Sequence, residues 1–442
     1  MAEPRYYDIR RSSGVAGSID IDNSTVESAG NTFFDVAVIR ALGPKGWGIV
    51  TVDNFGALSK PDVKGLITEA SNLALVTEEA VVLADAPSGL LPTPSYAEDP
   101  RNVSMEEKCS LLAEIESAAK VRGVTNTRAR YSETATTVTF TDSSDQSFTY
   151  EMVRSGYSVL AVAAKNGMMQ MGRESNHTVT GLNLRSQQEK GRAAGERAVS
   201  LLDAKAAKGG RMSAVLDQEL GGVFAHEAVG HASEGDLVKE GASVLAGKTG
   251  ELIGKPCVSV TDDPTLPMFG FMPVDDEGVR VQRTPIIKNG VLTNFLHSRQ
   301  TLAAVGDGIA GHARAQTGAV PVVRMSNTFI ENGDSSYGEI VEECRNGILL
   351  KGSRGGQVDP GRGAFQFNAE YGYLIENGEL GEMVRDVSLS GDILSTLHNI
   401  SLCGSDLKLS PGFCGKAGQS VPVTDGAPHL LLLDAVVGGQ GV

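Results

Sequence analysis

The N-terminal part of the chain mixes strand-like and helix-like spacing of its hydrophobic positions. Residues 17–40 and 47–53 alternate apolar and polar side chains, which is the pattern of half-buried strands. A helix is predicted after Ser59, with Pro61 in its first turn. Its buried face would consist of Val63, Leu66, Ile67, Ala70 and Leu73.

Residues 87–103 hold four prolines and one glycine, and we interpret them as a connection between two subdomains. A second helix follows, in which Ser104 and Glu107 form a capping box and Gly123 marks the end. Its apolar stripe comprises Cys109, Leu112, Ile115 and Ala119. Cys109 is thereby predicted to be a core residue rather than a metal ligand, since free cysteine packs as a small hydrophobic side chain.

Strand-like spacing continues from Val124 to Arg173, with turns at 142–146 and 166–167. Residues 186–207 are rich in Ala, Glu, Lys and Arg, and predict a connecting helix that stops at a pair of glycines. We place the main domain boundary here. The prediction is an N-terminal α/β region over 1–208 and a second domain over 209–442.

The second domain is predicted to be mostly β, which makes the fold class α+β. Residues 212–217 form a strand that leads into a histidine-containing stretch. Asn289-Gly290 and Asn377-Gly378 predict type I′ hairpins, because that turn needs positive φ at both central residues. Asn346-Gly347 instead follows a predicted helix over 337–345 and fits a C-terminal cap.

The stretch from Val223 to His231 carries the candidate chemistry. His226 and His231 are two of seven histidines, Glu227 follows the first, and the other positions are apolar or small. Two imidazoles and one acid are what a hydrolytic zinc site requires, with Glu227 as the general base. The alternative is that both histidines are ordinary core or surface residues and Glu227 a solvated acid.

The spacing H-E-x-x-x-H is awkward for a regular helix. Residues five apart are separated by about 140° around the axis, whereas residues four apart are separated by only about 40°. We therefore predict irregular backbone at Val229–His231, either a π-type bulge or an early helix end, for which Gly230 is suited.

A third protein ligand is usual in such sites. The candidate is Cys414, which lies in a Gly- and Pro-rich segment, with Lys416 near enough to favour its thiolate. Cys403 follows an apolar stretch and is expected in the core. Glu234 and Asp236 are candidates for a further ligand or for orienting an imidazole, or else they form a turn.

Other motifs are weaker. Residues 242–249 miss the P-loop pattern by one position, and no buried strand precedes them. The acidic runs 262–263 and 275–277 could bind a harder cation, but their flanking Pro and Gly favour solvated turns. The remaining histidines are expected to be structural: His177, His297, His312, His398 and His429.

Composition narrows the class of protein. With 53 glycines and 5% aromatic residues, the chain should contain many turns and much β structure. The net charge of −15 argues against a nucleic-acid partner. We expect no signal peptide and no membrane span. Five cysteines without a C-x-x-C pair predict a reducing, cytoplasmic location.

Four motifs in one order resemble the TldD/PmbA family, whose members are also catalogued as modulators of DNA gyrase. They are His226–His231 followed by Glu234-Gly235-Asp236, Val274–Gly278, Gly355–Asp359 and Cys414–Ser420. The chain resembles the metal-bearing TldD-type subunit more than its PmbA-type (TldE) partner, which lacks the intact histidine motif. The N-terminal part resembles the family more loosely.

This resemblance implies a zinc-dependent peptidase that acts on unfolded or short peptides. One zinc ion would be bound by His226, His231 and Cys414, with Glu227 as the catalytic base. It also implies a hetero-oligomer with the paralogue, although a homodimer remains open. The rival hypothesis is a non-catalytic regulatory or binding protein that uses the same scaffold on a protein partner. A nucleotide hydrolase is a third, weaker alternative.

Overall fold

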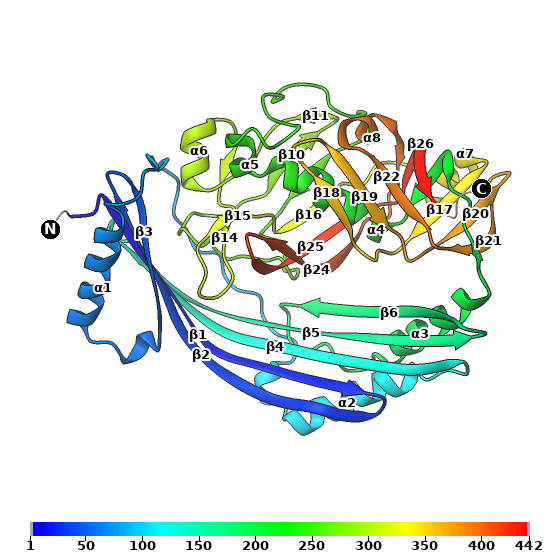
Figure 1. Cartoon of the computed structure of the whole chain (residues 1–442), viewed down its shortest axis with the longest axis horizontal. Coiled ribbons are helices and arrows are strands. Elements are labelled where there is room, and N and C mark those ends of the chain that lie inside the picture. Colours follow the sequence, from blue (N-terminus) through cyan, green and yellow to red (C-terminus); the bar gives the residue numbers. More distant parts are fainter. Residues whose placement is uncertain (1–2, 440–442) are drawn as a thin grey trace.

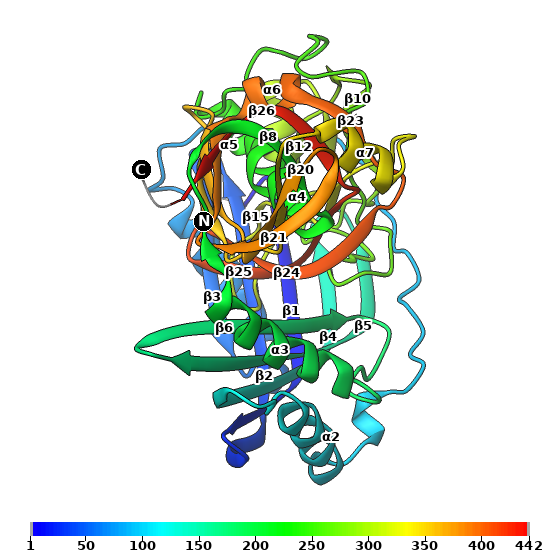
Figure 2. The same ribbon diagram turned by 90° about the vertical axis from the view of Figure 1, so that its right-hand side faces the viewer.

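The computed structural model describes residues 3–439, and Figure 1 shows two layers. A long curved sheet from the N-terminal part forms one layer, with helices on its convex side. The rest of the chain forms a thicker β-rich body that lies over the concave side. Figure 2, an end view, shows the same order of helices, sheet and body.

The curved sheet has six antiparallel strands in the order β3-β2-β1-β4-β5-β6. They are β1 (Tyr6–Asp22), β2 (Thr25–Gly43), β3 (Gly46–Asp53), β4 (Val124–Asp142), β5 (Ser147–Lys165) and β6 (Met168–Thr178). Strands β1 and β4 pair along most of their length, so segments on both sides of residues 87–103 share one sheet. The turns predicted at 142–146 and 166–167 connect β4 to β5 and β5 to β6.

Three helices pack on this sheet. Helix α1 (Lys60–Leu73) begins with the predicted capping residue Ser59 and covers β2 and β3. Helices α2 (Met105–Ala118) and α3 (Gln188–Asp203) lie together on the opposite end of the sheet and bury a shared apolar cluster. Helix α2 ends at Ala118, earlier than predicted. Gly123 (φ 107°) lies immediately before β4 and not at the helix end.

The C-terminal body contains two larger sheets. One has the order β11-β10-β9-β16-β25-β24. Its strands are β9 (Val260–Asp262), β10 (Thr284–Lys288), β11 (Val291–Leu292), β16 (Asn327–Ile330), β24 (Lys408–Lys416) and β25 (Gln419–Ala427). The short pairs β12 (Leu296–His297) with β13 (Ile309–Ala310), and β14 (Ala313–Arg314) with β15 (Val322–Val323), lie beside it.

The other sheet runs β18-β19-β22-β26-β8-β17-β20-β21-β7, with β23 (Ile400–Cys403) paired to β26. Its strands are β7 (Lys205–Ala206), β8 (Gly210–Leu216), β17 (Gly347–Lys351), β18 (Gly356–Asp359), β19 (Ala364–Asn368), β20 (Tyr371–Glu376), β21 (Glu379–Arg385), β22 (Ser388–Asp392) and β26 (Leu430–Gly438). The main core lies between these sheets.

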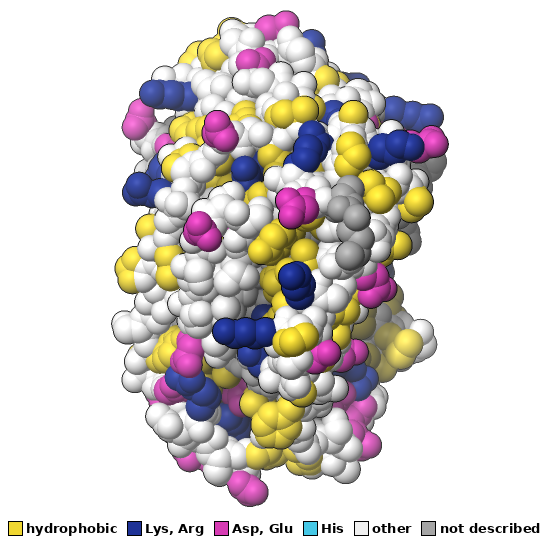
Figure 3. All heavy atoms as spheres, turned by 90° about the vertical axis from the view of Figure 1, so that its left-hand side faces the viewer, with side chains coloured by type: hydrophobic (Ala, Val, Ile, Leu, Met, Phe, Trp, Pro, Cys, Tyr) yellow, Lys and Arg dark blue, Asp and Glu magenta, His cyan; other side chains and the backbone are white. Residues whose placement is uncertain are grey.

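The body's helices are short. They are α4 (Gln218–Val223), α5 (Gly235–Lys239), α6 (Arg299–Val305), α7 (Tyr337–Cys344) and α8 (Ile393–Asn399). Among the described residues, no helix is long and apolar enough to cross a membrane. On the face seen in Figure 3, acidic and basic side chains are interspersed rather than gathered by sign.

The two hairpin turns predicted from Asn-Gly pairs are confirmed. Asn289-Gly290 joins β10 to β11 and Asn377-Gly378 joins β20 to β21, all four with φ between 49° and 81°. The cap of α7 differs from the prediction. Its left-handed residue is Arg345 (φ 55°), whereas Asn346 uses its side-chain oxygen to accept a hydrogen bond from the amide of Asn377.

The acidic runs are not the solvated turns that we predicted. Asp262, Asp275 and Glu277 are buried. The reason is that each has donors from distant parts of the chain. Glu277 pairs with Arg40 of β2 at 3.2 Å, and Asp276 pairs with Arg10 of β1 at 2.9 Å. These ion pairs join the C-terminal body to the curved sheet.

Candidate metal centre

A π-helical turn brings the two histidines of the motif together. Asp217 caps helix α4 by accepting a hydrogen bond from the amide of Leu220 at 3.0 Å, and the helix continues as a π-helical segment over Phe224–Gly230. The amide of His231 then donates to the carbonyl of His226, a five-residue span. Because this turn holds one residue more than an α-helical turn, residues five apart return to one face.

The ring centroids of His226 and His231 are consequently 5.3 Å apart. The irregular backbone predicted at Val229–His231 is present, but it begins earlier, at Phe224. Gly230 permits this path, because a Cβ there would lie 1.9 Å from the sulfur of Met325 on the neighbouring segment. The chain can pass so close to Met325 only without a side chain at position 230.

Cys414 reaches the histidines from strand β24. Its Sγ lies 3.5 Å from Nε2 of His231. One donor atom each from His226, His231 and Cys414 lies within 4.8 Å of the others. Arg324, whose side chain is fully buried, donates a hydrogen bond to the carbonyl of Cys414 and so holds the backbone of this strand in place.

The three side chains fit a tetrahedral metal. Two ligands of zinc, one sulfur and one nitrogen, should lie about 3.6 Å apart when both are at normal bond lengths. The Cys414–His231 distance agrees with that value. The buried Nδ1 of His226 has no hydrogen-bond partner among the described residues.

Glu234 orients the second histidine. Its Oε2 lies 2.9 Å from Nδ1 of His231, which leaves Nε2 of that ring to face Cys414. A carboxylate behind a histidine in this way is the usual support of a metal-binding imidazole. Of the two acids that the sequence offered, Glu234 therefore has the orienting position. Asp236 instead pairs with Lys416 at 2.7 Å.

Lys416 does not have the role that we predicted for it. Its ammonium is held by Asp236, by Glu234 at 3.0 Å and by the carbonyl of Val323. The thiolate is favoured by the histidines. Burial raises the pKa of Cys414, but the charges and hydrogen bonds of His226 and His231 outweigh burial and lower it to about 4.

The histidine pKa values shift in the complementary direction. Burial lowers the pKa of His231, yet Glu234 and Cys414 together raise it well above its usual range. The pKa of His226 is raised for the same kind of reason, mainly by Cys414. The cluster thus pairs a thiolate with two protonated histidines, and once those protons are displaced the three side chains are a strong set of donors for a soft or borderline divalent metal.

Glu227 lies at the open side of the cluster. About one third of its side chain is exposed, and its Oε2 lies 3.7 Å from Nε2 of His231. It is not one of the three converging donors. A carboxylate that borders the cluster and still faces open space can accept a proton from a molecule bound there.

Sequence reasoning missed Asp425 and Arg324. Asp425 of β25 lies close to Gly222 of helix α4, beside the cluster. Burial raises its pKa to about 7, partly offset by the charge of His226. Neither residue belongs to a recognisable spacing pattern, because each reaches the site through strand pairing over long sequence distances.

The other candidates lie elsewhere. Cys403 is buried in the core, as predicted, and Cys109 packs half-buried on the α2 cluster. His297 and His312 are buried, and His429 pairs with Asp406. Residues 242–249 lie between helix α5 and strand β9 and so lack the strand–loop–helix arrangement of a nucleotide-binding P-loop.

Models of known protein families match most of this chain. The model of the PmbA/TldA metallopeptidase C-terminal domain matches residues 209–439, and that of the family's central domain matches residues 98–202. The chain belongs to the PmbA/TldD metallopeptidase family. A metalloprotease of Archaeoglobus fulgidus is 41% identical over 98% of this chain and 100% of its own.

Other members of the PmbA/TldD family agree. A zinc metalloprotease TldD homolog of Saccharolobus solfataricus is 36% identical over 55% of each chain. Among solved structures, a Thermotoga maritima protein catalogued as a DNA gyrase modulator superposes with a TM-score of 0.82 at 23% identity, covering 98% of this chain and 96% of that one. TldE from Thermococcus kodakarensis gives 0.80 at 19% identity, with 98% and 97% covered. These structural likenesses show the fold.

Proposed function

We propose that this protein is a zinc-dependent peptidase that hydrolyses unfolded or short peptides. The observation that carries the proposal is the convergence of His226, His231 and Cys414 beside the open side chain of Glu227. Metalloprotease is also the name of relatives that match nearly the whole chain. When bound, zinc supplies Lewis acidity at the carbonyl under attack.

The residues of the chain have separate roles in this proposal. His226, His231 and Cys414 bind the metal, and Glu234 holds the ring of His231 through Nδ1. Glu227 takes the proton of the attacking water and returns it to the leaving amine. Its partial exposure suits this exchange, because the substrate and water must reach it.

A peptide would bind in extended form along a sheet edge. Strand β18 is an edge strand of the large sheet and contacts the π-helical turn that carries His226 and Glu227. Main-chain pairing along such an edge accepts many sequences, which fits substrates that are short or unfolded. This supports peptides rather than folded proteins as the substrate class.

The catalytic role is tested by Glu227→Gln. This variant should keep its zinc, because Glu227 is not a ligand, and should lose cleavage of a mixed peptide library by about 10²-fold or more. The measurements are elemental analysis and mass spectrometry of the peptides. Normal cleavage by the variant would show that Glu227 is not the base.

The ligand assignment is tested with two cysteine variants. Cys414→Ala should lose bound zinc, whereas Cys403→Ala should keep it. Cys403 is the matched control, because it is also buried but is not one of the three converging donors. Equal zinc content in both variants and the parent protein would refute the assignment. A metal-loaded parent that cuts no peptide, alone or with a paralogue, would favour the non-catalytic alternative.

Assembly and location are part of the same proposal. We expect a hetero-oligomer with a PmbA-type (TldE) paralogue, or else a homodimer, in the cytoplasm. In the part of the chain that the structure describes, residues 25–35 of β2 pair only with β1, and Phe33 on this free edge is 81% exposed. An open edge of this length can pair with another chain. Light scattering on the protein alone and mixed with the paralogue measures the assembly.

A further inference from the structure

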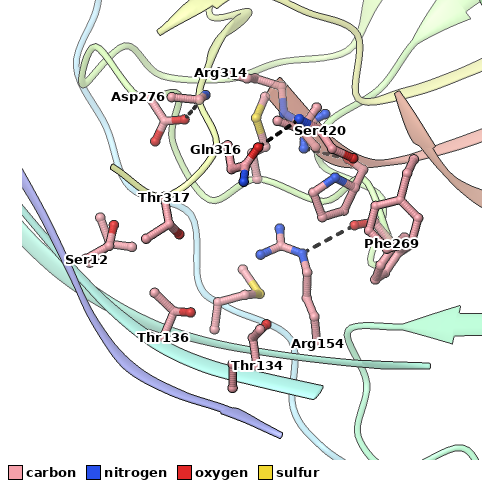
Figure 4. Close-up of a pocket in the computed structure, with 18 of the residues that line it drawn as sticks. Ser12, Thr134, Thr136, Arg154, Phe269, Asp276, Arg314, Gln316, Thr317 and Ser420 are labelled. Atoms are coloured by element: carbon pink, nitrogen blue, oxygen red, sulfur yellow. Dashed lines mark hydrogen bonds between the residues drawn. The ribbon is translucent and has the colours of Figure 1, made fainter. Parts of the chain in front are cut away.

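A cavity lies on the other side of the hairpin that carries Cys414. It has a volume of about 430 Å³ and is enclosed by strands β1, β4 and β5 of the curved sheet, by segments 269–276 and 314–317, and by the β24–β25 hairpin. That volume is in the range of small-molecule pockets. Figure 4 shows polar side chains from both layers converging on it.

The cavity and the metal cluster are separated by one strand. Phe413 lines the cavity, whereas its neighbour Cys414 faces the histidines, since successive side chains of a strand point to opposite faces. His177 and Phe269 pack on the ring of Phe413 at 5.4 Å and 5.2 Å between centroids. These aromatic contacts form part of the cavity wall.

Within residues 3–439, two arginines in the wall form no salt bridge. Arg154 donates to the carbonyls of Phe269 and Phe271, and Arg314, which is buried, donates to the carbonyls of Met325 and Pro422. Within residues 3–439, Nη1 of Arg154 makes no hydrogen bond, and its guanidinium points into the cavity in Figure 4. Backbone carbonyls satisfy donors but do not neutralise charge.

The acids that line the cavity are already engaged. Asp276 pairs with Arg10 at 2.9 Å and accepts from the amide of Ala315, while Glu133 pairs with Lys108 at 2.7 Å. Arg154 and Arg314 therefore leave positive charge in excess. Burial, with the charge of Arg154, lowers the pKa of Arg314 to about 10, although the charges of Asp276 and Asp262 act in the opposite direction. A bound anion would relieve this cost.

The rest of the wall selects among anions. Hydroxyl groups of Thr134, Thr136 and Thr317 offer hydrogen bonds beside the arginines, and Phe34, Met272 and Phe413 supply apolar surface. An inorganic phosphate would leave that apolar surface in contact with water. An organic carboxylate with an apolar side chain satisfies both parts of the wall.

We propose that this cavity binds the terminal carboxylate of a peptide-like molecule whose last residue is apolar, with the carboxylate on Arg154 and Arg314. The site is separate from the metal cluster and its occupation does not depend on peptide hydrolysis. It adds a carboxylate-binding subsite on the opposite face of the same hairpin.

Isothermal titration calorimetry with N-acetyl-phenylalanine and with its uncharged amide tests the proposal on the unmodified protein. The acid should bind at least tenfold more tightly than the amide. Arg154→Met should weaken binding of the acid tenfold or more, Arg154→Lys less, and His231→Ala should leave it unchanged. If Arg154→Met does not fold, the acid–amide comparison and the His231→Ala variant decide.

Other outcomes overturn the proposal. Equal binding of acid and amide, or binding of neither, would exclude a carboxylate subsite. Loss of binding in His231→Ala with retention in Arg154→Met would place the carboxylate at the metal cluster. Inorganic phosphate that displaces the acid at equal concentration would show a general anion site instead of one for an organic carboxylate.

Discussion

Replacing Gly230 by Ala tests why the histidine-bearing turn is shaped as it is. The backbone of Gly230 is helical (φ −58°, ψ −57°), so alanine suits the conformation and should gain about 1 kcal/mol of helix propensity. The added Cβ, however, would lie 1.9 Å from Sδ of Met325 and 3.1 Å from its Cγ. Met325 is fully buried and cannot simply swing into solvent.

The contact decides the sign of the effect. Overpacking of a filled core costs about 1–3 kcal/mol, and a separation near half of a normal carbon–sulfur contact belongs at the upper end. Subtracting the propensity gain leaves a net loss of about 2 kcal/mol in the free energy of unfolding. In a unit the size of the C-terminal body, this corresponds to a fall in Tm of about 4–8 °C.

Urea and thermal unfolding measure the loss, and two controls isolate its cause. Gly65→Ala lies in the exposed middle of helix α1 with no atom within 4 Å of the new Cβ, and should stabilise by about 0.5–1 kcal/mol. In a double-mutant cycle with Met325→Ala, the stability lost by the double variant should be about 1–3 kcal/mol less than the sum of the losses in the two single variants. Additive losses would refute the explanation by contact with Met325.

Three further predictions concern other parts of the molecule. Burial lowers the pKa of His297 to about 4, so its contribution to stability should be complete above pH 6.5 and decline by about 3 kcal/mol as pH drops through 6.5 towards 4. Urea unfolding at each pH should therefore show a smaller fall in stability for His297→Gln than for the parent protein. Arg40→Leu leaves two buried carboxylates unpaired and should lower the free energy of unfolding by about 3–5 kcal/mol. Arg101→Ala, whose ion pairs are more exposed, should lower it by less than about 1 kcal/mol, and equal losses would contradict the role of burial. Glu234→Gln should weaken zinc binding about 10–100-fold in competition with a chelator, and unchanged affinity would remove it from the support of the site.

The sequence was most informative where structure is local. Ser59, Asn289-Gly290 and Asn377-Gly378 specify caps and turns through their own side chains or φ angles, and each occurs as predicted. Local sequence could not show that the acidic residues 275–277 are buried. Its burial depends on Arg10 and Arg40, whose positions follow only from how the two layers dock.

The same distinction holds at the candidate metal centre. The spacing of the two histidines, with Gly230 between them, was enough to predict irregular helix. It did not show that the irregularity starts at Phe224, because a π-helical turn depends on packing against β16 and β25. Lys416 was assigned to the thiol by proximity in sequence, yet Asp236 and Glu234, about 180 residues away, hold its ammonium.

The alternation of Phe413 and Cys414 makes the length of one turn important. Strand β24 is an edge strand, and its register with β25 is fixed at the two-residue turn Ala417-Gly418, both with positive φ (51° and 71°). A shift of one residue exchanges the two faces of a strand. One inserted or deleted residue here would turn Phe413 towards the histidines and the thiol towards the carboxylate cavity. Substitutions in this turn should therefore be tolerated far better than any change in its length.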